Sequence, residues 1–234
     1  MLLNLDRRPD RLALSLQGAP AGGKIQLLRF RAFDGLNPAD IQQIEDQFGL
    51  RSDDFPHGAG SFSHRYSMLR ILQYGVDQGW PIFTVAEGDV SLRGCFRHLK
   101  FAINALNKHQ SDIFFLCGWD YQAKTSGYGH LCRVKRARCT LGTAFSVYSR
   151  QGAERLIEHS TRYPQMPLDQ AVAQLTVDGA LNCIGYRFNP YRQMPWLGTD
   201  VQVGATTPED RSMLRSLKSQ AKHIFQLGVN RLGL

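Results

Sequence analysis

The stretch "PIFTVAEGDVSL", residues 81–92, leads from mostly apolar residues directly into two acids that stand one residue apart. Residues 81–86 have the length and the apolar content of a buried β-strand. Glu87 and Asp89 follow at once, with Gly88 between them. Acids at the end of a buried strand either hold a ligand or form an ordinary solvated turn. Both interpretations stay open on this tripeptide alone.

Strand-like and helix-like segments alternate around this stretch. We expect strands at residues 1–5, 24–33, 81–86, 112–117, 142–149 and 180–190. We expect helices at residues 6–17, 38–48, 61–80, 96–109, 150–159 and 168–177. Such alternation predicts an α/β fold, with a mostly parallel central sheet and helices on both faces. Ligands of such sheets bind at the carboxyl ends of the strands, which is where Glu87 and Asp89 lie.

Local signals place some of these elements more closely. Pro9 suits the first turn of its helix, where a missing N–H costs little. Leu12 and Leu16 are spaced to form the inner stripe of that helix. Ser61 or Ser63 is a candidate N-cap for the helix over 61–80.

Composition sets broad limits on the kind of protein. The chain has 234 residues, 43% hydrophobic, and a formal net charge of +8, which favours anionic partners. No apolar run approaches the roughly 18 residues that span a membrane, and residues 1–11 lack the pattern of a signal peptide. We therefore expect a cytoplasmic protein. The five cysteines are scattered without a CxxC pair, so buried or free thiols are favoured over a zinc site or disulfides.

An acid-x-acid pair at a strand end has the chemistry of a site for a hard divalent cation. Carboxylate oxygens suit Mg²⁺ or Mn²⁺, which keep some water ligands and share the phosphate oxygens of a substrate. Gly88 has no side chain, so a ligand can approach the backbone there. Glu87 and Asp89 are therefore candidate metal ligands.

Six motifs in a fixed order resemble glycosyltransferase family 25, which includes bacterial lipooligosaccharide galactosyltransferases and collagen galactosyltransferases. They are "LLNLDRRPDRL", "RFRAFDG", "SFSHRYSMLRILQYG", "PIFTVAEGDVSL", "GTAFSVYSRQGAERLI" and "MPLDQAV". The resemblance spans roughly residues 2–190. It implies a GT-A-like single domain and transfer of a sugar, galactose first among the candidates, from a UDP-sugar to a hydroxyl of a glycan acceptor. It also implies a role in the biosynthesis of lipopolysaccharide or another surface glycan.

The same resemblance implies roles for particular residues. Mn²⁺ or Mg²⁺ would bridge Glu87 and Asp89 to the diphosphate of the donor, with Gly88 beside it. The loop that begins at Asn4, Leu5 and Asp6 would hold the uridine, with a plain strand end before a helix as the alternative. Arg8 and Arg11 would reach either the phosphates or only solvent.

The implied reaction inverts the sugar and therefore needs a general base. Asp169, in "QMPLDQAV", is the candidate, and an acid at a helix N-terminus is the plain alternative. His64 is a candidate for donor or acceptor contact, or a structural histidine. Asp34 and Gly35 match a family turn that ordinary turn chemistry explains.

One departure from the family pattern bears on activity. The family has Glu-Asp-Asp where this chain has Glu87-Gly88-Asp89, so the middle acid is missing. The Glu-x-Asp frame that metal binding needs survives. A catalytically impaired member that binds nucleotide sugars or acts as a scaffold is therefore an alternative.

The basic residues of the C-terminal part suggest a second region. We expect a glycosyltransferase domain at 1–205 and a basic amphipathic helix or tail at 206–234. The stretch 209–228 would lie either on an anionic membrane, near a lipid-linked acceptor, or on the domain itself. The net charge and "RVKRAR" (133–138) also allow a nucleic-acid-binding domain, but no recognition motif supports it, so no nucleic acid is expected.

Overall fold

The computed structural model describes residues 1–17, 19, 26–55, 57–93, 95–117, 121–124, 131–137 and 143–186. The strands are β1 (Leu2–Asn4), β2 (Arg29–Arg31), β3 (Ile82–Glu87), β4 (Ile113–Cys117), β5 (Tyr121–Lys124), β6 (Leu131–Ala137), β7 (Phe145–Ser149) and β8 (Cys183–Tyr186). The helices are α1 (Pro9–Leu16), α2 (Pro38–Phe48), α3 (Gly58–Asp77), α4 (Cys95–His109), α5 (Arg150–Ser160) and α6 (Leu168–Val177), with a 3₁₀ turn η1 (Ser52–Asp54).

The strands form one sheet in the order β2-β1-β3-β7-β4-β8-β6-β5. The pairs β1–β2, β1–β3 and β4–β8 are parallel, and the pairs β3–β7, β4–β7, β6–β8 and β5–β6 are antiparallel. The α/β class is as predicted, but the sheet is mixed, so the expectation of a mostly parallel sheet is wrong. The physical reason is β7, which enters between β3 and β4 and runs against both.

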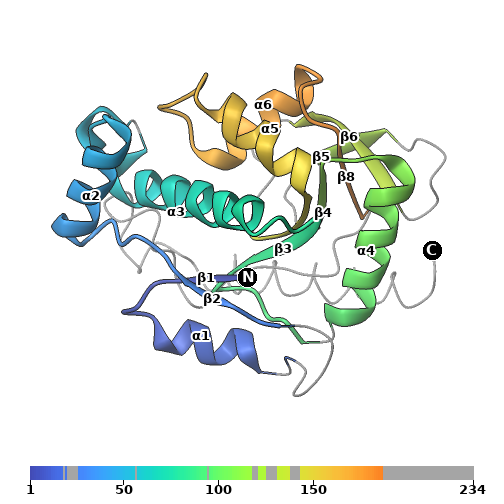
Figure 1. The fold of residues 1–234 in the computed structure, drawn as a ribbon, viewed down its shortest axis with the longest axis horizontal. Coiled ribbons are helices and arrows are strands. Elements are labelled where there is room, and N and C mark those ends of the chain that lie inside the picture. Colours follow the sequence, from blue (N-terminus) through green and yellow to red (C-terminus); the bar gives the residue numbers. More distant parts are fainter. Residues whose placement is uncertain are drawn as a thin grey trace, which may run out of the picture.

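Helices cover both faces of the sheet, as expected (Figure 1). Alternate residues of β4 show the division, because Ile113 and Phe115 lie in one apolar cluster and Phe114 and Leu116 in the other. The first cluster includes residues of α3, α5 and α6, and the second includes residues of α4 with Leu12 of α1 at its margin. All five residues of β4 are buried, so β4 is a central strand of the core.

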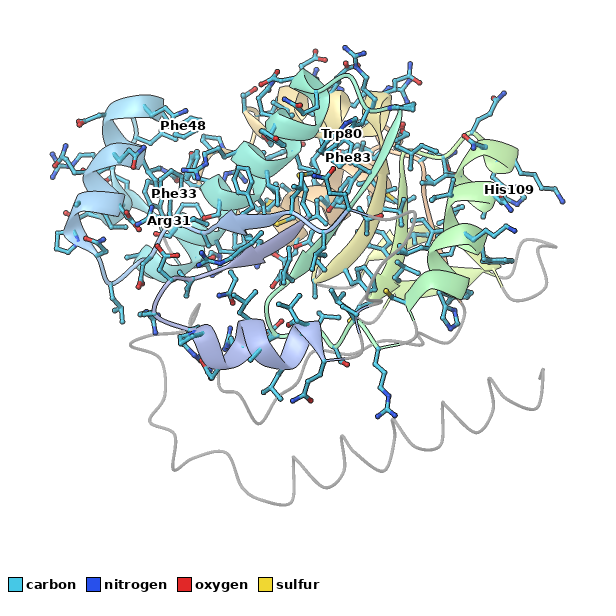
Figure 2. The ribbon with its side chains drawn as sticks, turned by 60° about the horizontal axis from the view of Figure 1, so that its bottom comes forward. Arg31, Phe33, Phe48, Trp80, Phe83 and His109 are labelled. Carbon is cyan, nitrogen blue, oxygen red and sulfur yellow. The ribbon has the colours of Figure 1, made fainter. Side chains whose placement is uncertain are left out.

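A third apolar cluster fixes α2 against α3. It contains Phe33, Ile44, Phe55, Phe62 and Tyr66. Phe33 follows β2, and Figure 2 shows it with Arg31 on the side of the sheet that carries α2. This cluster holds the segment after β2 close to the first turns of α3.

Several local predictions are confirmed and others are wrong. Pro9 occupies the first turn of α1, as predicted. However, α1 buries Arg11 and Ser15, while Leu16 is 37% exposed, so the predicted apolar stripe is wrong at that position. Neither Ser61 nor Ser63 caps α3, because the helix begins at Gly58 and buries both serines.

The remaining differences concern the strands and the C-terminal part. The strand expected at 24–33 covers only Arg29–Arg31, and β5 and β6 were not expected. Residues 187–234, including the expected helix at 209–228 and the domain boundary at 205, lie outside the described residues. In the described ranges, no helix has the length and hydropathy that a membrane crossing requires.

Candidate functional site

A cleft opens where the carboxyl ends of β1, β2 and β3 meet the N-terminal half of α3. We call it the strand-end cleft. Its lining comprises Leu3, Asn4, Leu5, Arg8, Arg11, Ala32, Phe33, Asp34, Gly35, Gly60, His64, Glu87, Gly88 and Asp89. Four of the six family-like motifs contribute lining residues. Segments far apart in the sequence therefore converge on one site.

The register of β1 against β3 decides what residue 88 can be. Leu3 pairs with Glu87, which places Asn4 beside Gly88 at the next position. A Cβ atom built on Gly88 would lie 2.3 Å from Oδ1 of Asn4 and 3.1 Å from its Cγ. Real Cβ atoms do not approach so closely. A middle acid at position 88 would therefore require Asn4 to move, and Gly88 is the residue that this close approach needs.

Asn4 also organises the loop between β1 and α1. Its Nδ2 atom donates to the carbonyl oxygens of Leu5, at 2.7 Å, and of Arg8, at 3.1 Å. From the other side, the buried Ser15 hydroxyl donates to the carbonyl oxygen of Gly88 at 2.6 Å. Asn4 thus holds the β1–α1 loop, and Ser15 joins α1 to the 87–89 turn.

Glu87 ends β3 with its carboxylate in the cleft. Its Oε1 atom lies 3.2 Å from Nε2 of His64 and accepts a hydrogen bond of 3.2 Å from the Thr143 hydroxyl. Burial alone would raise the pKa of Glu87, but the His64 cation, Thr143 and Arg11 outweigh burial and lower it. Glu87 is therefore held as a carboxylate.

His64 shows the opposite balance. Burial disfavours its cation, but the carboxylates of Glu87, Asp169 and Asp89 outweigh burial and raise the pKa of His64. The three acids that influence His64 come from the 87–89 turn and from the first turn of α6. The predicted residues His64, Glu87, Asp89 and Asp169 are thus brought into one electrostatic group.

Asp89 faces Arg11 of α1. The Nη1 atom of Arg11 lies 3.8 Å from Oδ2 of Asp89, and the two side chains are only 10% and 14% exposed. Arg11 is buried by α1 together with Ser15, whereas Leu16 of the expected leucine stripe is exposed. A buried guanidinium beside a carboxylate in a cleft is well placed to contact an anionic ligand.

Asp169 stands in the first turn of α6. Its Oδ1 atom accepts a hydrogen bond of 2.8 Å from the backbone N–H of Gln170. Burial raises the pKa of Asp169, and Glu87 adds to that rise, while His64 and the Gln170 N–H oppose it. A carboxylate with a raised pKa is a better proton acceptor than an ordinary surface acid.

Two other predicted residues have partners that explain them structurally. Asp6 pairs with Arg29 and, at 2.9 Å, with Arg31, and its side chain is 57% exposed outside the cleft lining. The predicted contact of Asp6 with a nucleotide is therefore not supported by its position. Arg8 does line the cleft, and it also pairs with Asp10 at 2.7 Å.

The turn after β2 is structural, as its chemistry suggested. Asp34 accepts a hydrogen bond from the backbone N–H of Leu36 at 2.9 Å and pairs with Arg7 at 2.6 Å. A Cβ atom on Gly35 would lie 2.7 Å from the Cα atom of Gly60, so this turn contacts the backbone of α3 directly. The contact closes one wall of the cleft.

Sequence reasoning missed three polar residues that support the site. Thr143 contacts Glu87, Ser15 holds Gly88, and Arg65 of α3 donates to the carbonyl oxygens of Ser160 and Met166 ahead of α6. Thr143 stood in the motif "GTAFSVYS", whose threonine was an available signal. Ser15 and Arg65 gave no such signal, because their partners are backbone atoms distant in sequence.

The carboxylate oxygens of the cleft fit a divalent cation whose remaining coordination positions are filled by a ligand and water. The described residues contain no group of three or more His, Cys, Asp or Glu side chains that could hold a metal ion by themselves. Glu87 and Asp89 line the same cleft, and two carboxylates with phosphate oxygens and water make the usual Mg²⁺ environment. His64 and Arg11, their cationic neighbours, would then compete with the metal or turn to the ligand.

No protein-family model matches this chain, and no curated protein is significantly similar to it. The family resemblance therefore rests on the sequence motifs alone.

Proposed function

We propose that this chain is a metal-dependent glycosyltransferase that moves a sugar from a UDP-sugar to a hydroxyl group of a glycan. The observation that carries the proposal is the strand-end cleft, which combines two carboxylates with buried and half-buried cations at the carboxyl ends of parallel strands. That location is typical of nucleotide sites in α/β sheets. The motif order of glycosyltransferase family 25 supports the same activity.

In this mechanism Glu87 and Asp89 would hold the cation, and Arg8 and Arg11 would face the diphosphate. The bound Mn²⁺ or Mg²⁺ supplies Lewis-acid stabilisation of the negative charge on the departing UDP. The buried Arg11 guanidinium adds a fixed positive charge whose position is set before the reaction. The β1–α1 loop, which Asn4 holds, supplies backbone groups to the nucleoside.

Asp169 removes the proton from the acceptor hydroxyl as this oxygen attacks the anomeric carbon. Burial raises the pKa of Asp169, which favours proton abstraction, and the His64 cation opposes part of that rise. Attack opposite to the leaving UDP inverts the anomeric centre. UDP leaves with the electron pair of the broken bond, and the proton stays on Asp169.

We propose an active enzyme although the middle acid is missing. Gly88 fits closely against the Asn4 side chain, and Glu87 and Asp89, which the metal would need, both line the cleft. An inactive nucleotide-sugar-binding protein would share this cleft, so turnover distinguishes the two.

The test is UDP release from UDP-galactose, UDP-glucose and their N-acetylated analogues in the presence of Mn²⁺. We expect release from at least one donor, reduced about 100-fold or more by Asp89→Asn and unchanged by Asp54→Asn, an exposed acid outside the cleft. UDP binding without release from any donor, with or without glycan acceptors, would favour the inactive alternative. Equal release by wild type and Asp89→Asn would overturn the site assignment.

A further inference from the structure

A second hollow lies between the start of α3 and the loop that joins α5 to α6. We call it the α5–α6 hollow. Its lining comprises His57, Tyr163, Pro164, Gln165, Met166 and Gln170. None of these residues belongs to the lining of the strand-end cleft. The proposed reaction assigns no role to any of them.

The two hollows are neighbours through shared helices. His57 caps α3, and Gly60, which lines the cleft, follows three residues later. At 1.5 Å per residue the two positions differ by about 4.5 Å along the helix axis. On α6, Gln170 lines the hollow and directly follows Asp169, the candidate base. Asp169 therefore adjoins a lining residue of the α5–α6 hollow, and the charges of His64 and Glu87 reach it from the side of the cleft.

Hydrogen bonds from α3 hold the loop between α5 and α6 in place. The fully buried guanidinium of Arg65 donates to the carbonyl oxygens of Ser160 and Met166, both at 2.6 Å. Burial lowers the pKa of Arg65, so the fold places a cation where burial opposes its charge. Backbone hydrogen bonds from Tyr163 to Ser160 and from Met166 to Tyr163 tighten the same loop. The hollow is thus preformed, which reduces the entropy cost of binding.

The chemistry of the lining selects an uncharged polar ligand with an apolar face. The six lining residues include no aspartate, glutamate, lysine or arginine. The Tyr163 hydroxyl donates to Asp178 at 3.1 Å, so the ring rather than the hydroxyl is left for a ligand. Two side-chain amides, of Gln165 and Gln170, offer donors and acceptors to hydroxyl groups. A sugar ring has this combination of a C–H face and peripheral hydroxyls.

We propose that the α5–α6 hollow binds the terminal sugar ring of the acceptor glycan and presents one of its hydroxyls to Asp169. The role as an acceptor site rests on the proposed function, whereas the binding of a sugar is inferred from the lining residues alone. The ring of Tyr163 would stack on the C–H face of the sugar, and the two glutamine amides would bond to its hydroxyls.

The test is saturation-transfer difference NMR with neutral methyl glycosides of galactose, glucose and N-acetylglucosamine. We expect signals from at least one glycoside with wild type, about tenfold weaker with Tyr163→Ala and retained with Tyr163→Phe, which keeps the ring. Tyr74→Ala is the matched control, because Tyr74 contacts Phe30 and Trp80 outside both hollows. Its signals should equal those of wild type.

UDP titration on the same samples separates the two proposals. UDP binding without any glycoside signal, or with equal signals from wild type and Tyr163→Ala, would overturn the acceptor site and leave the donor site standing. Glycoside signals that depend on Tyr163 without UDP binding would overturn the proposed function and retain a sugar-binding surface. Failure of the Tyr163→Phe variant to retain the signal would overturn the stacking role.

Discussion

The two ends of the sheet use acids in different ways. At the amino end of β4, Asp112 pairs with Arg155 at 3.0 and 3.2 Å and accepts a hydrogen bond of 2.8 Å from the backbone N–H of Asn182. Its side chain is only 4% exposed. At the carboxyl end of β3, Glu87 and Asp89 line a cleft and have cations at 3.2 and 3.8 Å.

This difference in contacts distinguishes an acid that stabilises the fold, Asp112, from acids that are available to a ligand, Glu87 and Asp89. Asp112 joins α5, β4 and the start of β8, so its bonds contribute to stability. The longer contacts of the cleft acids leave room for a ligand to rearrange them. Substitutions at the two ends should therefore affect different measurements.

The largest effect is expected for Asp169→Asn at the carboxyl end. Loss of the proposed base should lower the transfer rate about 10²- to 10⁴-fold. Burial raises the pKa of Asp169, so its charge costs stability, and the variant should melt no lower than wild type. Thermal melting and transfer assays measure the two effects, with Asp77→Asn, an acid at the end of α3, as control. A rate within threefold of wild type would remove Asp169 from catalysis.

The raised pKa of Asp169 also predicts how stability and transfer rate depend on pH. Because the pKa of Asp169 is raised in the folded state, its contribution to stability is present below the pKa of the unfolded chain and is lost as pH rises through the folded pKa. The acidic limb of the transfer rate should accordingly lie above the range of an ordinary aspartate. Melting curves of wild type and Asp169→Asn should diverge across this pH window, and parallel curves would contradict the assignment.

A smaller effect, on stability alone, is expected for Asp112→Asn at the amino end. The variant loses the charge-assisted bonds to Arg155 and presents an amide to two donors, so unfolding should become easier by about 2 kcal/mol. UDP affinity should stay within about twofold, since Asp112 lies outside the cleft lining. Urea unfolding and calorimetry measure the two quantities. A tenfold loss of UDP affinity would show that the two ends are coupled.

The smallest expected effects come from two glycines, Gly88 at the carboxyl end of β3 and Gly152 next to Asp112 at the amino end of β4. A Cβ atom on Gly88 would lie 2.3 Å from the Asn4 side chain, and one on Gly152 would lie 2.4 Å from the backbone oxygen of Asp112. Gly88→Ala and Gly152→Ala should each cost about 1–3 kcal/mol, but only Gly88→Ala should weaken UDP binding. The added cost of Gly88→Ala should largely vanish in an Asn4→Ala background. Additive effects in that double-mutant cycle would contradict the proposed contact.

The sequence predicted the parallel edge of the sheet better than the rest. Strand–helix alternation around β1 and β3 is a local pattern, and it placed Glu87 and Asp89 at a strand end correctly. The antiparallel insertion of β7 depends on contacts with β3 and β4 that are distant in sequence, so no local pattern reports it. β5 and β6 carry polar residues such as Lys124 and Arg133 that obscure a strand pattern.

The residues of the candidate site also divide into those that the sequence could predict and those that it could not. His64, Glu87, Asp89 and Asp169 could be nominated from motifs, because each stands near a recognisable strand end or helix start. The inward turn of Arg11 and the supporting bonds of Ser15 and Arg65 could not, since their partners are set by the packing of whole helices. Asp6 was nominated from its position in a motif and instead joins an exposed ion pair.

The most direct measurement of the central claim is calorimetric titration of UDP into wild type and Asp89→Asn, with and without Mn²⁺. We expect binding by wild type that strengthens at least tenfold with Mn²⁺, and loss of that metal dependence in Asp89→Asn with an unchanged melting temperature. Absence of UDP binding by wild type under both conditions, or Mn²⁺-dependent binding that survives in Asp89→Asn, would contradict it.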